Sequence, residues 1–197
     1  NLARTLFPLG DLTKKELRQM ATEKGFIDLV NKSESYEICF IPDNDYRSFL
    51  KRKAPAEVEK IGEGKMVLRD GTQVGTHEGY PFFTIGQRKG MGIALGEPMY
   101  VVDIKTDTNT IVLGSKDDLM GQTMKVEKIN LVKYEKLPIE LDVVTKIRYK
   151  DCGAASAISQ ENNSVYVKFH QPVSAITPGQ SAVFYEGDDI VGGGIIC

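Results

Sequence analysis

Short runs of alternating apolar and polar residues fill the chain from about residue 54 onward. The segment KMVLRDGTQVG (65–75) has two such runs around Asp70-Gly71, the strongest short-range signal for a β-hairpin. The segment YVVDIKTDTNTIVLG (100–114) repeats the pattern, with Asp107, Thr108 and Asn109 at the turn. Further β-rich runs follow at a spacing of roughly ten residues: IELDVVTKIRY, AASAISQ, SVYVKFH, QSAVFYE and DIVGGGII. This spacing predicts an antiparallel barrel or sandwich.

The first 50 or so residues have helical rather than strand periodicity. Thr13 and Glu16 have the spacing of a capping box, and Gly25 is suited to end the helix that follows in a left-handed conformation. A second helix is expected over 45–52, with Asp45 near its start. The basic residues at its C-terminal end (51–53) suit the helix dipole, and we interpret them as a solvated helix end.

These patterns predict an α+β protein that is mostly β. We expect a short helical remnant of a nucleotide-binding domain over 1–53, a small central β-rich domain over 54–118 and a C-terminal antiparallel β-barrel over 119–197.

The amino-acid composition argues against several classes of protein and of binding site. The 197 residues are 41% hydrophobic and 26% charged with a net charge of −2, which argues against a dedicated nucleic-acid coat but not against a local basic site. No run approaches the roughly 18 apolar residues of a membrane span. Three widely separated cysteines (39, 152 and 197) and two histidines predict neither a disulfide framework nor a metal site. They fit a reducing compartment, so we expect a cytoplasmic protein without a membrane partner.

Cys39 lies in the short run ESYEICFIP (34–42), between Ile38 and Phe40. Apolar neighbours are typical of a small buried thiol, and no Lys, Arg or His within six residues could activate it. From this run alone, packing is the favoured interpretation and chemistry the alternative.

The glycine-rich stretch THEGYPFFTIGQRKGMGIALGEP (76–98) carries Gln87, Arg88 and Lys89 near its centre. Its backbone could approach a ligand closely and its cations suit phosphate contacts, although no phosphate-loop motif is present. A tight β-connection with solvated cations is the alternative.

Two further stretches have candidate binding residues. In KIRYK (146–150), a strand would place Lys146, Arg148 and Lys150 on one face, either as a basic stripe for an anionic partner or as a charged edge. In ITPGQSAVFY, a Pro-Gly turn would present Gln180 at the start of a strand. The run Gly192–Gly194 suggests a bulged strand or close backbone packing.

Several of these stretches occur in one order that resembles the bacterial tRNA-specific 2-thiouridylase (MnmA) family. The resemblance runs through nearly the whole chain and is carried by FPLGDLTKKELR, EICFIP, THEGYPFFTIGQRKGMGI, YVVD, KIRYK, TPGQSAVFY and GGGII.

The resemblance implies an enzyme that uses ATP to adenylate the C2 oxygen of the wobble uridine in tRNA. A cysteine persulfide, charged by a sulfur-relay protein or cysteine desulfurase, then delivers sulfur to give 2-thiouridine. The matching cysteine is Cys39, and the matching tRNA contacts are Arg148, Tyr149 and Gln180; Gln87, Arg88 and Lys89 are added as tRNA-binding candidates.

The chain departs from the family pattern in ways that limit this expectation. Glu37 and Pro42 replace the glycines usual around the cysteine. The S-G-G-x-D-S loop for ATP and the D-x-x-C motif of the resolving cysteine are absent, and neither Cys152 nor Cys197 is expected to replace the latter. The resemblance therefore implies a C-terminal portion that is inactive alone, with ATP bound elsewhere. The alternatives are a non-catalytic tRNA-binding β module and a barrel that binds only protein.

Overall fold

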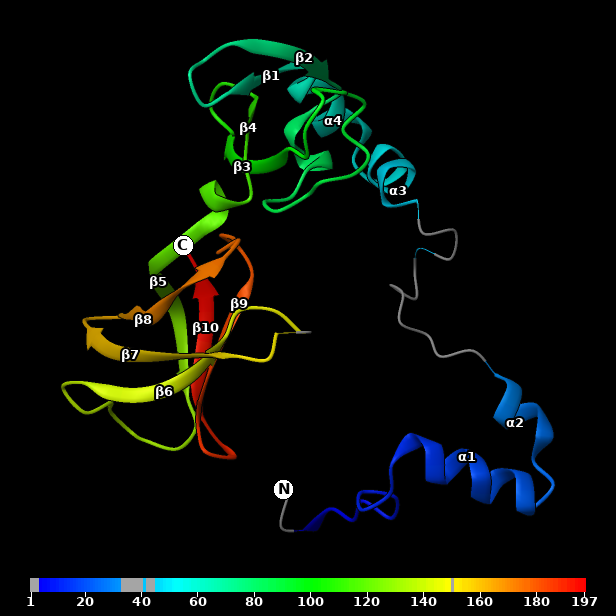
Figure 1. Ribbon diagram of the computed structural model, residues 1–197. Coiled ribbons are helices and arrows are strands. Elements are labelled where there is room, and N and C mark those ends of the chain that lie inside the picture. The colour runs from blue at the N-terminus through cyan, green and yellow to red at the C-terminus, as the bar shows by residue number, and fades with distance from the viewer. Residues whose placement is uncertain (1–3, 33–40, 42–44, 150) are drawn as a thin grey trace. The chain divides into compact units, whose positions relative to one another are not determined.

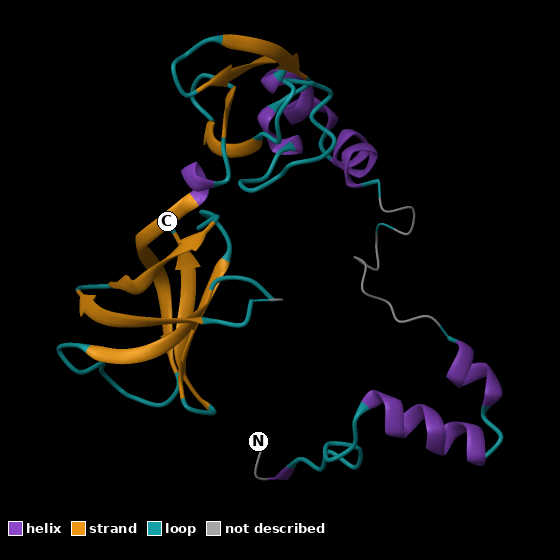
Figure 2. Cartoon of the chain, viewed as in Figure 1, coloured by secondary structure: helices purple, strands orange, loops and turns teal. Residues whose placement is uncertain are grey.

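The computed structural model describes residues 4–32, 41, 45–149 and 151–197. They fall into two compact units, residues 1–53 and 54–197, which are described separately. Figures 1 and 2 show that the described part of the first unit is helical and that the described strands belong to the second. Among the described residues, no helix has both the length and the apolar character needed to cross a membrane.

Two of the three α-helices described in the first unit lie where the sequence predicts, and the short one between them was not predicted. Helix α1 (Lys14–Glu23) has a capping box, in which the Glu16 amide donates to Thr13 Oγ1 (3.4 Å) and the Thr13 amide donates to Glu16 Oε2 (2.7 Å). Gly25, with φ +78°, ends it in the left-handed conformation. Helices α2 (Ile27–Asn31) and α3 (Tyr46–Lys53) follow, and Asp45 Oδ1 caps α3 by accepting the Ser48 amide at 3.0 Å.

The second unit opens with a helix that the sequence analysis did not predict. Helix α4 spans Pro55–Ile61 and has proline at its first position, where the missing amide hydrogen has no intrahelical partner anyway. Asn109 holds the end of this helix, since its amide nitrogen donates to the carbonyls of Ile61 (3.0 Å) and Gly62 (3.1 Å). The same side chain accepts the Tyr80 amide at 3.1 Å, which joins α4 to the loop that follows the first hairpin.

A four-stranded mixed sheet follows α4. Its strands are β1 (Gly64–Leu68), β2 (Gln73–His77), β3 (Tyr100–Lys105) and β4 (Thr110–Gly114), in the order β2-β1-β4-β3. Both predicted hairpins are confirmed, with β1 antiparallel to β2 and β3 antiparallel to β4. The central pair, β1 and β4, is parallel, and a 3-10 helix η2 (Tyr80–Phe82) lies between the hairpins.

The remaining strands form a closed barrel in the order β10-β5-β8-β7-β6-β9. After a 3-10 helix η3 (Asp117–Leu119), they are β5 (Met120–Leu131), β6 (Leu141–Lys146), β7 (Ala154–Glu161), β8 (Ser164–Ser174), β9 (Ser181–Glu186) and β10 (Asp189–Ile196). Every pairing is antiparallel, so the predicted mostly-β class with an antiparallel barrel is confirmed. The long strand β5 was not among the runs that the sequence analysis singled out.

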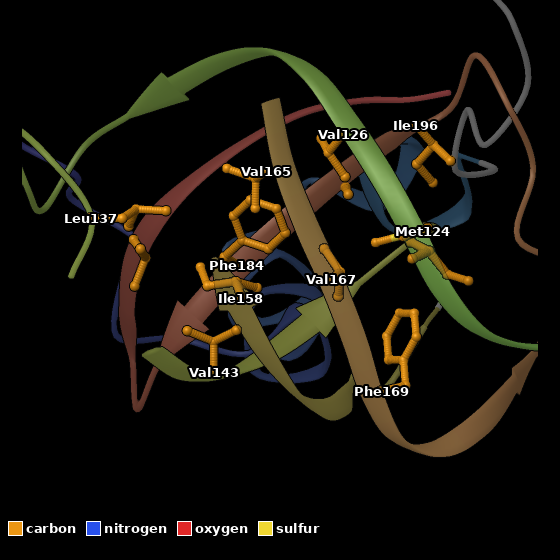
Figure 3. Packing of buried hydrophobic residues seen from close by; sticks show 13 residues of the cluster. Met124, Val126, Leu137, Val143, Ile158, Val165, Val167, Phe169, Phe184 and Ile196 are labelled. Carbon is orange, nitrogen blue, oxygen red and sulfur yellow. The ribbon is translucent and has the colours of Figure 1, made fainter. Parts of the chain in front are cut away.

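The barrel core consists of side chains that alternate inward along its strands. Figure 3 shows Val126, Val167, Phe169 and Phe184 among the labelled residues that fill the interior. Phe184 is fully buried, whereas its neighbours Val183 and Tyr185 are only partly buried, as expected for the two-residue period of a strand.

The glycine run of β10 produces the close packing that the sequence predicts. A Cβ atom at Gly193 would lie 2.5 Å from the Ala182 carbonyl oxygen on β9, and one at Gly194 would lie 2.4 Å from the Glu127 carbonyl oxygen on β5. The register also shifts along both neighbours of β10, as in bulged strands. Side chains at these positions would therefore push β10 away from one neighbour or the other.

His77, at the end of β2, is a buried titratable side chain of the mixed sheet. Its ring is buried, packs edge-on against Phe83 at 5.2 Å and accepts the Gly79 amide at Nδ1 (3.1 Å). Burial lowers the pKa of His77. Protonation of Nδ1 would also break the bond from Gly79.

We expect this unit to lose stability on acidification from about pH 7.5 to about pH 5.5. Because the folded pKa of His77 is lowered, the unfolded chain takes up the proton first below about pH 6.5. Urea midpoints should fall over this range, and H77N, which keeps an acceptor but does not titrate, should flatten the dependence. H170N, at an exposed histidine, is the matched control. Equal pH dependence in wild type and H77N would contradict this role.

Candidate nucleic-acid interface

The β6 and β9 strands border an open cleft of about 710 Å³ on the outside of the barrel. Three chain segments line it: the end of β6 with the turn after it, the turn before β9, and β9 itself. The cleft contains the three tRNA-binding candidates that the sequence places far apart, Arg148, Tyr149 and Gln180.

Strand register decides which side chains of β6 and β9 face this cleft. Thr145 pairs with Phe184, and both are fully buried inside the barrel. Lys146 pairs with Val183 and therefore lies on the outer face, together with Tyr185. The Lys146 Nζ lies 5.2 Å from the centroid of the Tyr185 ring, within the range of a cation–π interaction.

The predicted strand over 146–150 is wrong beyond its first residue, because β6 ends at Lys146. A turn follows, in which Asp151 Oδ2 accepts the Ile147 amide (3.2 Å) and Asp151 Oδ1 accepts the Gly153 amide (3.1 Å). Side chains in a turn do not alternate: Ile147 is buried, while Tyr149 is 93% exposed. Lys150 lies outside the described residues.

Arg148 is anchored, whereas Tyr149 is open to solvent. The Arg148 Nη2 donates to the Ser174 carbonyl at 2.6 Å, a charge-assisted bond to the end of β8. One of its five guanidinium donors is used in this way, so the others stay available to a ligand. The Tyr149 ring extends from the same turn and presents a free aromatic face.

Gln180 lies after the predicted Pro178-Gly179 turn, in which Gly179 has φ +86°. Its backbone is fixed on both sides, since the Gly179 amide donates to the Ile196 carbonyl and the Ile196 amide donates to the Gln180 carbonyl, both at 2.8 Å. The Gln180 side chain lines the cleft from this position.

The three candidate residues of the glycine-rich loop differ in their contacts and exposure. The Gln87 side chain holds the loop: Oε1 accepts the Thr84 amide (3.2 Å) and Nε2 donates to the Lys89 carbonyl (3.0 Å). Arg88 and Lys89 are exposed, and Arg88 lines a separate cleft of about 340 Å³ with apolar residues of the same loop. The structure therefore does not bring these residues into the cleft of Arg148.

The candidate catalytic residue, Cys39, lies outside the described residues. Cys152 and Cys197 are both free and exposed. No group of His, Cys, Asp and Glu that could hold a metal ion occurs in the described part of the chain. The described residues of the first unit are helices and their connections, without a strand, glycine loop and helix to cradle phosphates, so we assign no residue to ATP.

Sequence reasoning missed Asp151, Ser174 and Tyr185 as parts of this site. Asp151 could have been found, because an Asp two residues before a glycine is typical of a turn. Ser174 and Tyr185 could not, since only the pairing of distant strands brings them to the 146–149 segment.

We expect D151A to loosen the turn after β6 without unfolding the barrel, because the turn amides would lose their acceptors. Amide hydrogen exchange at Ile147 and Gly153 should accelerate by about tenfold or more, corresponding to roughly 1–3 kcal/mol. D151N keeps one carbonyl oxygen and should have a smaller effect. Unchanged exchange in D151A would show that other contacts hold the turn.

Three consecutive segments match models of known protein families. Residues 1–43 match a model described as the tRNA methyl transferase HUP domain. Residues 47–115 match the tRNA methyl transferase PRC-barrel domain, and residues 121–196 match the aminomethyltransferase beta-barrel domain.

Curated relatives match over the whole chain. The chain is 55% identical over 197 residues to the tRNA-specific 2-thiouridylase MnmA of Cytophaga hutchinsonii, covering 100% of this chain and 54% of that protein. It is also 55% identical to MnmA of Amoebophilus asiaticus (100% of this chain, 52% of that protein) and 51% identical to MnmA of Salinibacter ruber (100% and 51%). The chain spans about half the length of these relatives. Together, these matches show that the chain belongs to the tRNA-specific 2-thiouridylase (MnmA) family.

Proposed function

We propose that this protein acts in a tRNA-modifying sulfurtransferase that makes 2-thiouridine at the wobble position, and that the cleft beside β6 and β9 binds the tRNA. One observation carries the proposal for the cleft: Arg148, Tyr149 and Gln180 are separated in sequence by up to 32 residues (180 − 148) and converge on it. The names of the relatives support the reaction.

The chemistry of the three side chains matches that of RNA. A guanidinium with free donors suits a phosphate, and an exposed aromatic ring can stack on an unpaired base. A side-chain amide can donate to and accept from a base edge or ribose hydroxyl. Tyr149 is almost fully exposed, so a base could stack on its ring without displacing another side chain. Arg148 is already held in place by its bond to Ser174.

Arg88 and Lys89 are proposed as a second, electrostatic contact to the tRNA, presented by the loop that Gln87 stabilises. In this scheme Gln87 acts on the loop rather than on the RNA.

We assign the central tRNA-binding domain to 54–118 and the barrel domain to 119–197, which agrees with the separate family matches to 47–115 and 121–196.

In the proposed reaction ATP is a substrate that transfers its AMP group to the C2 oxygen of the uridine and releases pyrophosphate. The terminal sulfur of a Cys39 persulfide attacks C2, and the bond from C2 to the activated oxygen breaks as AMP leaves. A second thiolate then cleaves the sulfur–sulfur bond, which leaves a disulfide on the enzyme and sulfur on the uridine. A cellular thiol reductant would then reduce this disulfide, a sulfur-relay protein or cysteine desulfurase would recharge the freed Cys39 thiolate, and we place the reaction in the cytoplasm.

R148A should weaken tRNA binding by about tenfold, as expected for loss of a charge-assisted hydrogen bond. The measurement is titration of an unmodified tRNA transcript with a wobble uridine over a series of salt concentrations. The slope of log affinity against log salt should become shallower by about one. K168A removes an equally exposed charge on β8, outside this cleft, and should change little. An equal loss in K168A would indicate a general charge effect instead of a site.

C39S, introduced into the gene at its own locus, should reduce 2-thiouridine in bulk tRNA to background, because serine cannot carry a persulfide. Mass spectrometry of digested tRNA measures the product. C152S and C197S, at the two exposed thiols, are matched controls and should keep normal 2-thiouridine. Normal 2-thiouridine in C39S, with tRNA binding intact, would instead support a non-catalytic tRNA-binding module.

A further inference from the structure

Lys146 is the second cation that lines the cleft, and it lies outside the set of tRNA contacts implied by the family resemblance. Its ammonium group lies 5.2 Å from the centroid of the Tyr185 ring. Its aliphatic stem packs against the backbone of Gly153, where a Cβ atom would lie 3.2 Å from Lys146 Cγ and 2.5 Å from Val144 Cγ1. Gly153 also has φ +90°, so this position favours glycine for two independent reasons. The lysine is thus confined from two sides.

Such confinement is unusual for a surface lysine. A lysine side chain loses rotamer freedom when it is ordered, and a solvated lysine has no reason to lose it. Here the ordering occurs before any ligand binds. A ligand that needs a cation at this point would therefore meet one that is already oriented.

Charge in the cleft is not neutralised within the described structure. The ion pairs described here join other residues, and none includes Lys146 or Arg148. Asp151 keeps its negative charge in the same turn, but it is not among the residues that line the cleft, and its oxygens accept the amides of Ile147 and Gly153. Two cations from one short segment thus line a single cleft on a chain whose net charge is −2. Such a local excess of positive charge suits a polyanion.

We infer that Lys146 is a further tRNA-binding residue, which contacts a phosphate of the RNA backbone in the cleft of Tyr149 and Gln180, and that Tyr185 positions it. This inference rests on the proposed function of the cleft. Arg148 directly precedes Tyr149 in the chain. Lys146 lies two residues before Arg148, at the end of β6. Both cations line the same cleft as Tyr149, so the strand of a nucleotide stacked on this ring would meet two groups that can bind its phosphates.

Tyr185 acts through Lys146, so its effect depends on the ring and not on its hydroxyl group. The face of an aromatic ring attracts a cation, whereas a leucine of similar bulk fills space without this attraction. Y185F should therefore retain wild-type binding, whereas Y185L should weaken it. In addition, Y185L should have no effect once Lys146 has been replaced by alanine.

The experiment uses the whole chain with the same unmodified tRNA transcript, titrated at several salt concentrations. K146A should weaken binding by about three- to tenfold and make the salt slope shallower by about one. Y185L should weaken binding by a smaller factor, and K146A/Y185L should match K146A. K168A serves as the control for loss of a surface charge, and thermal unfolding checks that each variant remains folded.

The outcomes separate this inference from the proposed function. Wild-type affinity in K146A combined with weak binding in R148A would overturn the role of Lys146 and leave the cleft as the tRNA site. Wild-type affinity in both variants would overturn both. A Y185F defect equal to that of Y185L would show that the hydroxyl group, and not the cation–π contact, is what matters. Additive losses in K146A/Y185L would show that Tyr185 acts independently of Lys146.

Discussion

Close approach of β10 to both of its neighbours is the constraint on which the barrel depends. The carbonyl oxygens of Ala182 and Glu127 lie where side chains at Gly193 and Gly194 would begin, so only glycine lets β10 pair with β9 and β5 at once. Closure leaves the barrel without an unpaired edge strand and encloses the core around Phe184. The glycines thus stabilise the fold because they have no side chain that would push β10 away from β9 or β5.

The cleft follows from this closure. Because β9 is held by β10 on one side, its other side is free to pair with β6, and that pairing places Lys146 diagonally from Tyr185 on the outer face. The end of β10 also fixes the turn before β9 through the bonds between Ile196, Gly179 and Gln180. The site is therefore attached to a rigid scaffold, while its exposed aromatic side chain sits on a short turn, an arrangement common in binding sites.

An acidic chain can bind an anion when its positive charge is concentrated. The described residues that line the cleft include Lys146 and Arg148 and no acidic side chain, and the carboxylate of Asp151 is directed to backbone amides of the turn. At the C-terminal end of β9, Lys133 is paired with Glu186 and with Asp189 of β10, whereas Lys146 and Arg148 have no such partner among the described residues. Two lysines of the same barrel thus differ in availability for reasons of placement, and the net charge of −2 does not report this difference.

Local sequence determined the features whose cause is local. The capping box of Thr13, the hairpin turn at Asp70-Gly71 and the close packing of the β10 glycines were all predictable, because each depends on a few adjacent residues. Helix α4 and strand β5 were missed, and the strand predicted over 146–150 ends at its first residue, because Asp151 bonds turn the backbone there. Only tertiary structure decided which candidates share a site. Strand pairing brought Tyr185 and Gln180 to Lys146 and Tyr149, whereas the Gln87 side chain bonds within its own loop. The sequence could not predict the shared site, because contacts between distant residues leave no periodic signal in the chain.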